Sequence, residues 1–216
     1  MEAHVHPLRA DAARNRARVL DAARTAFAEA GLDVGVEEIA RRAGVGKGTL
    51  YRRFPTKEAL VCAIFEDILL DFERVSAEAL EGDEVGQAFV AFLNTCAVMQ
   101  AENQGFYDVV SRVGSHVITA DQSARFRTAA AGPLERAQAA GVVRDDLVAE
   151  DLLQIFRMLG PTTRSFSGGE PVDHWPRYLA FLLDAMRPAA ATPLPPRPEQ
   201  EVQGAQPLRP TPIIRP

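Results

Sequence analysis

The chain has 216 residues, of which 47% are hydrophobic, so it is long enough to bury the core of one large domain or of two smaller ones. It contains no run of about 18 apolar residues and starts without the apolar stretch of a signal peptide, which excludes a membrane partner and predicts a cytoplasmic protein. The two cysteines, Cys62 and Cys96, are too few for a disulfide framework or a zinc cluster, and His4 and His6 alone do not make a metal site.

The net charge of -5 is unevenly distributed along the chain. Residues 1–60 contain 11 Lys and Arg against 8 Asp and Glu, whereas the remaining residues contain 13 against 21. We therefore expect the N-terminal part to meet a polyanion, from which the acidic remainder stays clear.

Apolar residues recur at helical spacing up to residue 187, and no segment alternates apolar and polar residues long enough for a strand, so the predicted fold class is all-α. The first helix covers residues 11–30, with one apolar face formed by Val19, Ala22, Ala23, Ala26, Phe27 and Ala30. A second helix covers residues 36–43, with acidic residues in its first turn and Gly44 at its end.

A third, short helix is predicted between Gly46 and Phe54, because Pro55 disfavours helix at the preceding residue. Thr56 is placed to cap a long helix over residues 57–81. Further helices are expected at 84–102, 105–113, 118–140 with a break at Gly132–Pro133, 146–160 and 173–187. Nine of the 15 prolines follow Arg187, which predicts a disordered tail over residues 188–216.

Residues 46–49, Gly-Lys-Gly-Thr, resemble the end of a nucleotide-binding phosphate loop, and a small phosphotransferase is therefore one interpretation. A phosphate loop needs a preceding strand and a first glycine at position 41, where this sequence has a helix-forming segment and Arg41. The sequence also lacks the Ser, His and Cys motifs of hydrolases. We predict that the chain is not an enzyme and has no cofactor or metal, with the phosphotransferase kept as the alternative.

The other interpretation of this segment is a helix-turn-helix that lies against double-stranded DNA. With Leu50 and Phe54 turned inward, helical geometry points Arg52 outward and places Gly48 and Thr49 beside it. A bare backbone allows close approach to a groove, an arginine can reach guanine edges, and hydroxyl and ammonium groups can contact phosphates. The predicted DNA-binding residues are Lys47, Gly48, Thr49, Tyr51, Arg52 and Lys57.

Residues 31–61 strongly resemble the DNA-binding domain of TetR-family transcriptional regulators. The family pattern is met at Ile39, Ala40, Ala43, Gly44, Val45, Gly48, Leu50, Tyr51, Phe54, Lys57 and Leu60. Two positions depart from it, because Gly46 replaces the usual Ser of the recognition helix and Val34-Gly35 replaces the usual Thr that caps the second helix.

The resemblance implies a three-helix DNA-binding domain over residues 11–56 and a helical ligand-binding and dimerisation domain over residues 57–187. It also implies the function of a homodimeric, sequence-specific regulator, most simply a repressor that a small-molecule effector releases from its operator. A DNA-binding regulator without a ligand is the further alternative.

Apolar stripes in the last two predicted helices are typical either of a dimer interface built from two helices of each chain or of faces that complete the chain's own core, and the family resemblance favours the dimer. The predicted interface residues are Leu152, Phe156, Trp175, Leu179, Leu182, Leu183 and Met186. A dimer of this kind presents two recognition helices about 34 Å apart, or a multiple of that distance, to a near-palindromic operator.

The middle of the second domain mixes bulky apolar side chains with a few polar ones, as ligand pockets do. The candidate ligand-binding residues are Phe92, Cys96, Met99, Tyr107, His116, Phe126 and Phe156. Aromatic and Met residues at helical spacing are also typical of plain core, so both interpretations stay open at this point.

Overall fold

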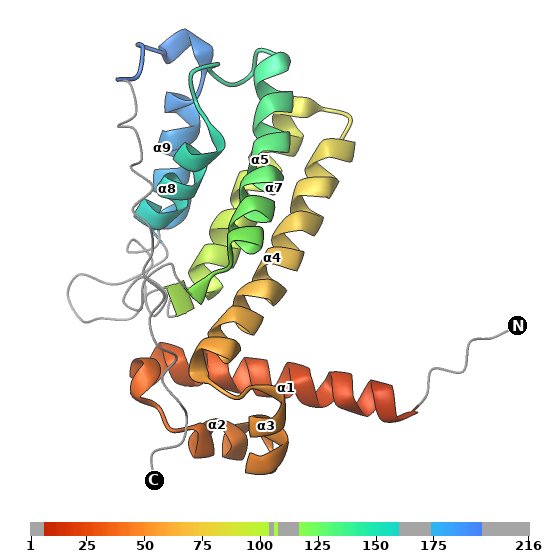
Figure 1. Ribbon diagram of the computed structural model, residues 1–216. Coiled ribbons are helices and arrows are strands. Elements are labelled where there is room, and N and C mark those ends of the chain that lie inside the picture. Colours follow the sequence, from red (N-terminus) through yellow and green to blue (C-terminus); the bar gives the residue numbers. More distant parts are fainter. Residues whose placement is uncertain (1–6, 104–105, 108–116, 160–173, 196–216) are drawn as a thin grey trace, which may run out of the picture. The chain divides into compact units, whose positions relative to one another are not determined.

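The computed structural model describes residues 7–103, 106–107, 117–159 and 174–195 (Figure 1). Within these ranges all regular elements are helices, which confirms the all-α prediction. The elements are α1 (Pro7–Ala30), η1 (Gly31–Asp33), α2 (Val36–Ala43), α3 (Lys47–Arg53), α4 (Lys57–Glu81), α5 (Val85–Glu102), α7 (Ala120–Ala139), α8 (Ala149–Leu159), α9 (Trp175–Ala185) and η4 (Pro188–Ala190). None of the described helices is both long enough and apolar enough to cross a lipid bilayer.

The chain divides into two compact units, and the division falls within α4, between Asp67 and Ile68. The first unit contains α1, α2, α3, the start of α4 and the described residues 103, 106–107 and 117–119, and the second contains the rest of α4 with α5, α7, α8 and α9. The first turns of α4 carry three fully buried side chains, Leu60, Val61 and Ile64. The boundary predicted between residues 56 and 57 lies at the start of α4, whereas the first unit continues along that helix to Asp67.

The first unit is held together by the packing of α1 against α2. Helix α1 buries Val19, Leu20, Ala23, Ala26 and Phe27, and α2 buries Val36, Ile39, Ala40 and Ala43. These residues largely reproduce the two apolar faces expected from helical spacing. Helix α1 starts at Pro7, before the expected residue 11, and a proline is well suited to a first helical turn because its missing N–H has no helical partner to lose.

The second unit packs its helices around one apolar cluster, and α7 contacts both α5 and α8. Three phenylalanines pack together in it, since the ring of Phe72 lies 5.8 Å from that of Phe92 and 4.4 Å from that of the partly buried Phe126, measured between ring centroids. Leu93, Leu134 and Leu152 are almost completely buried beside them. An aromatic core of this kind gives the unit its stability through the area that it removes from water.

Helix α7 runs without interruption through Pro133, which corrects the break expected at Gly132–Pro133. A proline inside a helix leaves the carbonyl four residues earlier, here that of Ala129, without its N–H partner. The buried hydroxyl of Ser76 on α4 donates a hydrogen bond of 2.7 Å to that carbonyl. The helix therefore continues because a residue far away in the sequence satisfies the acceptor that the proline leaves free.

Two arginines of α7 complete its attachment to α4. Arg125 forms a bidentate ion pair with Glu73, with both N–O distances at 2.8 Å. Arg136 donates to the backbone carbonyls of Ala79 at 2.8 Å and Gly82 at 2.6 Å, where the last carbonyls of α4 lack helical partners. Together with Ser76, these side chains tie the two helices along much of the part of α4 that belongs to the second unit.

Residues 188–194 are anchored, which differs from the expectation of a disordered tail beginning at residue 188. Arg144 pairs with Asp146 at 2.6 Å and also donates to the carbonyl of Thr192, and the N–H of Leu194 donates to Asp146 at 3.0 Å. The hydrogen bonds from Arg144 and Leu194 hold the pKa of Asp146 well below its usual range. This ion pair supplies backbone partners that the sequence pattern did not reveal; residues 196–216 lie outside the described residues.

Candidate nucleic-acid interface

The turn between α2 and α3 is fixed by its backbone. Gly44 ends α2 with a φ of 64°, in the left-handed region that favours glycine. Its N–H donates to the carbonyl of Arg41 at 3.2 Å, and the N–H of Val45 donates to that of Ala40 at 3.0 Å. These two bonds close the end of α2 and set the direction in which α3 begins.

Helix α3 has one buried face and one exposed face, as the helix-turn-helix interpretation predicts. Leu50 and Phe54 are only 1% and 5% exposed, and the N–H of Phe54 donates to the carbonyl of Leu50 at 2.8 Å where the helix ends. Tyr51 is half-buried, and the exposed residues are Lys47, Gly48, Thr49, Arg52 and Arg53. A Cβ atom added at Gly48 would meet no heavy atom within 4 Å, so packing inside the protein does not require a glycine there.

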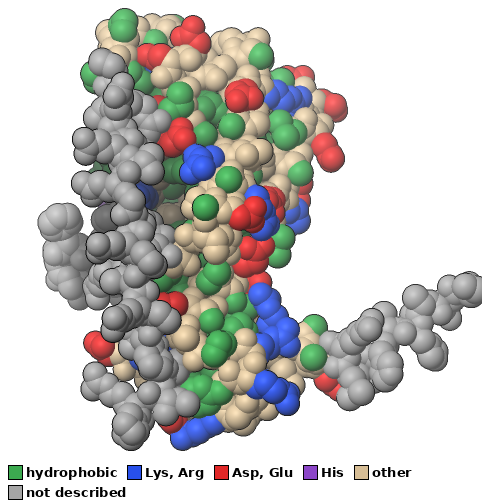
Figure 2. Space-filling model, in the orientation of Figure 1, with side chains coloured by type: hydrophobic (Ala, Val, Ile, Leu, Met, Phe, Trp, Pro, Cys, Tyr) green, Lys and Arg blue, Asp and Glu red, His purple; other side chains and the backbone are tan. Residues whose placement is uncertain are grey.

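Several cations of the first unit are already paired with carboxylates, namely Arg14, Arg16, Arg41, Arg42 and Lys47. Arg41 and Arg42 both bond to Glu38, and these hydrogen bonds lower its pKa to about 2. Lys47 donates a hydrogen bond of 3.2 Å to Glu37. A backbone hydrogen bond and, to a smaller extent, this bond from Lys47 lower the pKa of Glu37. Figure 2 shows several of the Lys and Arg side chains on the surface formed by α1–α3.

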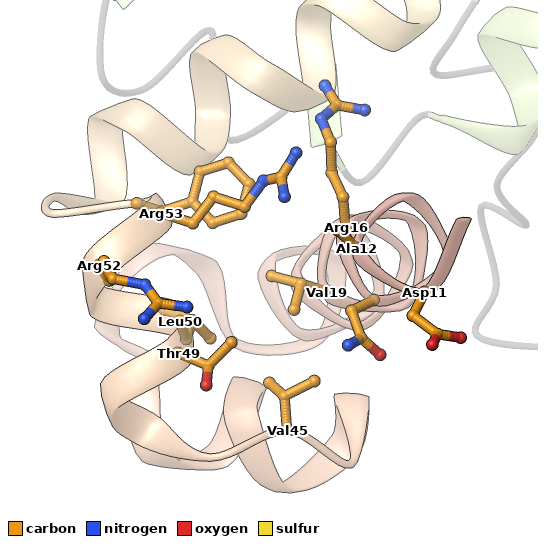
Figure 3. A pocket seen from close by; sticks show the side chains of 11 residues that line it. Asp11, Ala12, Arg16, Val19, Val45, Thr49, Leu50, Arg52 and Arg53 are labelled. Atoms are coloured by element: carbon orange, nitrogen blue, oxygen red, sulfur yellow. The ribbon is translucent and has the colours of Figure 1, made fainter. Parts of the chain in front are cut away.

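Arg52 and Arg53 differ from these residues, because in the described part of the chain neither forms an ion pair with a carboxylate. Both are exposed on α3 and line a hollow of about 410 Å³ between α1 and α3 (Figure 3). The α1 side of this hollow includes Asp11, Asn15 and Arg16. Sequence reasoning did not include Arg53, Asn15 or Arg16 among the site residues; the charge of Arg53 was a usable signal, whereas the other two come near α3 only through the fold.

Helix α4 begins as its sequence predicts. The N–H of Ala59 donates to the hydroxyl of Thr56 at 3.1 Å, which confirms the predicted cap. Lys57 is half-buried in the first turn. The structure thus places five of the predicted DNA-binding residues on one short helix and the sixth at the start of the next.

The phosphate-loop alternative for residues 46–49 is wrong. Residues 36–43, which would have to form the preceding strand, form α2, and the described residues contain no strand. In the described part of the chain no three His, Cys, Asp or Glu side chains are grouped as metal ligands. His4 and His6 lie outside the described residues.

Comparison with known proteins assigns both halves of the chain. Residues 19–64 match the family model of bacterial regulatory proteins of the tetR family, and residues 84–187 match that of the C-terminal domain of SbtR-like transcriptional regulators. The crystal structure of the TetR transcription regulatory protein from Mycobacterium vanbaalenii is 35% identical, with a TM-score of 0.61 over 84% of this chain and 99% of that one. This chain belongs to the TetR family. It is a transcriptional regulator with a helix-turn-helix DNA-binding domain.

Two further solved structures extend the TetR-family likeness. A TetR transcriptional regulator from Streptomyces coelicolor is 30% identical, with a TM-score of 0.60 over 81% of this chain and 99% of that one. A tetR-family regulatory protein from Rhodococcus RHA1 is 19% identical, with a TM-score of 0.62 over 80% of this chain and 97% of that one, and shows the same fold. No curated protein matches this chain.

Five of the seven candidate ligand-binding residues of this TetR-family protein belong to one cluster. Phe92, Cys96 and Phe156 are buried in the cluster of the second unit, where Met99 and Phe126 pack against them. Burial raises the pKa of the Cys96 thiol, and such a thiol is a packing group rather than a reactive one. Tyr107 belongs to the first unit, and His116 lies outside the described residues.

The candidate dimer residues of this TetR-family protein face largely inward. Leu152, Phe156, Leu179 and Met186 are at most 6% exposed in the single chain, and Trp175, Leu182 and Leu183 are partly buried against the same cluster. The apolar side chains that α8 and α9 leave exposed are others, namely Met158, Tyr178 and Phe181. Helical spacing identified the two apolar helices, and four of the seven predicted residues are buried in the chain's own core.

Proposed function

We propose that the protein is a homodimeric repressor that binds a near-palindromic operator and is released from it by a small-molecule effector. The observation that carries this proposal is α3, whose apolar face is buried while its exposed face carries two arginines without a carboxylate partner in the described residues. Unpaired guanidinium groups on a short exposed helix suit the phosphates and base edges of a major groove.

The residues of α3 have different roles in this proposal. Arg52 reads a guanine edge, Gly48 lets the helix approach the groove closely, and Thr49 contacts a thymine methyl group or a phosphate. Tyr51 and Lys57 contact phosphates on either side. Lys47 must leave Glu37 before it can bind DNA, and their exposed ion pair costs little to break in water.

The second unit supplies the dimer interface in this proposal. Met158 on α8 and Tyr178 and Phe181 on α9 expose 61%, 48% and 73% of their surfaces, and a second chain packed on α8 and α9 would remove this area from water. If two chains pack across a twofold axis beside these helices, the exposed side chains of both chains become buried together. The partly buried Trp175, Leu182 and Leu183 would border that interface.

The effector site is proposed within the second unit, around Phe92, Met99 and Phe126. Apolar and aromatic linings with few polar groups suit a largely hydrophobic small molecule. Replacing Met99 with Trp would fill such a site, so the variant should still bind the operator but should no longer be released by the effector. A screen in which no metabolite releases the wild-type protein would favour a regulator without a ligand.

The decisive experiment selects DNA from a random pool and measures the affinity of variants for the selected operator. Arg52→Ala should reduce the discrimination between operator and mismatched duplexes by about 1–3 kcal/mol. Tyr51→Phe and Lys57→Ala should instead weaken binding to all duplexes alike, because phosphates carry no sequence information.

Two results would contradict the proposal. The first is a protein that sediments as a monomer at micromolar concentration and selects DNA without half-site symmetry. The second is an Arg52→Ala variant whose loss of affinity is the same for every sequence, as for the phosphate-contact variants.

A further inference from the structure

Residues 11–18, near the start of α1, bury no side chain. The helix begins at Pro7, yet Val19 is its first buried residue among those whose burial is described, and residues 11–18 are exposed or half-buried. Short helical segments are marginal in water unless they pack against something. The segment also carries three arginines against one aspartate between residues 11 and 18. A basic helical extension without a core contact is available to bind a partner.

One side of this extension forms a wall of the hollow between α1 and α3 (Figure 3). Asp11, Ala12, Asn15, Arg16 and Val19 line it from α1, and Thr49, Arg52 and Arg53 line it from α3. Its volume of about 410 Å³ exceeds what one phosphate group occupies, so a sugar-phosphate segment can enter it. The hollow therefore adjoins the same exposed residues of α3 that are assigned to DNA.

The charged side chains around the hollow differ in whether they are already paired within the protein. Arg16 on the α1 wall is held by Asp67 at 2.8 Å, and Asp11 is held by Arg14. The side-chain oxygen of Asn15 accepts a hydrogen bond from Arg18, so the NH₂ group of the amide is left as a donor. Arg52 and Arg53 add two guanidiniums without a carboxylate partner in the described residues. The hollow thus offers an amide donor and net positive charge.

We propose that the hollow between α1 and α3 receives a backbone phosphate of the operator, held by Arg53 from α3 and by the Asn15 amide from α1. This inference rests on the proposed function and extends the DNA-binding surface beyond the helix-turn-helix. When α3 lies in the major groove, the two sugar-phosphate strands that border the groove run beside the helix. One of them passes the side on which α1 stands, so Arg53 and Asn15 clamp the same strand from two helices.

The test uses the full chain, the selected operator, and duplexes in which one phosphate at a time is replaced by a neutral methylphosphonate. In the wild type, one position in each half-site, at the edge of the major groove, should weaken binding. Asn15→Asp should lower operator affinity about tenfold or more, because it replaces a donor with a charge that repels phosphate. Arg53→Gln should reduce the slope of log affinity against log salt by about 0.9 for each phosphate contact that it loses.

The distinctive result is coupling between protein and DNA changes. In Asn15→Asp and Arg53→Gln, the methylphosphonate at the sensitive position should no longer weaken binding, since the contact is already lost. Two variants outside the hollow are controls. Ala17→Asp adds a negative charge to the exposed surface of α1, as Asn15→Asp does, and Arg41→Gln removes a positive charge from α2, as Arg53→Gln does from α3. Both controls should lose less than threefold in affinity and keep the full methylphosphonate effect.

Three outcomes would overturn the inference. Asn15→Asp could lose no more affinity than Ala17→Asp, or no phosphate position could couple to Arg53. Inorganic phosphate could bind to wild type and not to Arg53→Gln in the absence of any such coupling, which would make the hollow a site for a free anion. A wild-type protein that selects no DNA at all would instead refute the proposed function, so the two failures are distinguishable.

Discussion

The charged side chains of α2 and α3 and the polar side chains that join α4 to α7 differ in how strongly water competes for their hydrogen bonds. We call the second set the joint between α4 and α7. In the first region, Arg41, Arg42 and Lys47 pair with glutamates at the surface, where water competes for each of them. In the second, the buried hydroxyl of Ser76 and the half-buried pair of Arg125 and Glu73 bond to partners within the protein. Surface pairs can be exchanged for DNA phosphates at little cost, whereas the joint between α4 and α7 resists rearrangement.

This contrast separates function from stability in the molecule. Substitutions on α3 should change DNA binding and leave the free energy of unfolding nearly unchanged. Substitutions inside the second unit should change the free energy of unfolding and, in the absence of an effector, leave the DNA affinity of the folded protein nearly unchanged.

The largest effect on stability is expected in the apolar core of the second unit. Leu93 is fully buried, so Leu93→Ala should lower the free energy of unfolding by about 2–5 kcal/mol. Leu70→Ala is the matched control, because Leu70 is 53% exposed in the same unit and should cost far less. Trp175, the one tryptophan, packs against this cluster, and its fluorescence during urea unfolding measures both. Equal effects of the two variants would contradict the assigned packing.

The next effect concerns the joint between α4 and α7. Ser76→Ala leaves the buried carbonyl of Ala129 without a partner and should cost about 1–3 kcal/mol of unfolding free energy. In a Pro133→Ala background the N–H of residue 133 can bond to that carbonyl, so Ser76→Ala should cost distinctly less there. A double-mutant cycle measures the difference. Equal costs in the two backgrounds would show that Ser76 does not compensate for the proline.

The joint also shows where prediction from the sequence reaches its limit. The bounds of the helices at 36–43 and 57–81 followed from glycine, proline and threonine signals that act within a few residues. The course of α7 through Pro133 depends on Ser76, 53 residues from Ala129. No local pattern carries that information, and the break expected at Gly132–Pro133 was wrong for this reason.

The candidate sites show the same division. The exposed residues of α3 follow from helical geometry once Leu50 and Phe54 are taken as buried, so this part of the site was predictable. The two stripes that contain Leu152 on α8 and Leu179 on α9 were also recognisable, but periodicity cannot tell whether an apolar face meets the same chain or a second copy. The hollow beside α3 needed the fold, because it brings Asn15 and Arg53 together across 38 positions of the sequence.

The smallest effect on stability, and the sharpest test of the contrast, uses two glycines of the same short helix. Gly46 caps α3 without a side-chain hydrogen bond, and a Cβ atom there would lie 4.0 Å from the Thr49 hydroxyl, so a serine fits. Gly46→Ser should stabilise the protein by a few tenths of a kcal/mol through capping. Gly48→Ser should also stabilise it slightly, by about 0.5 kcal/mol or less, because serine is the better helix former and the site is open.

Operator binding should separate these two variants. The serine hydroxyl at position 46 adds a donor near the backbone phosphates, so affinity should stay the same or rise. The side chain at position 48 stands between α3 and the groove, so affinity should fall although the protein is no less stable. Thermal unfolding and operator titration of both variants measure the two quantities separately. If Gly48→Ser binds the operator as tightly as the wild type, close approach of the backbone at Gly48 is not what that glycine provides, and the face of α3 assigned to DNA has to be redrawn.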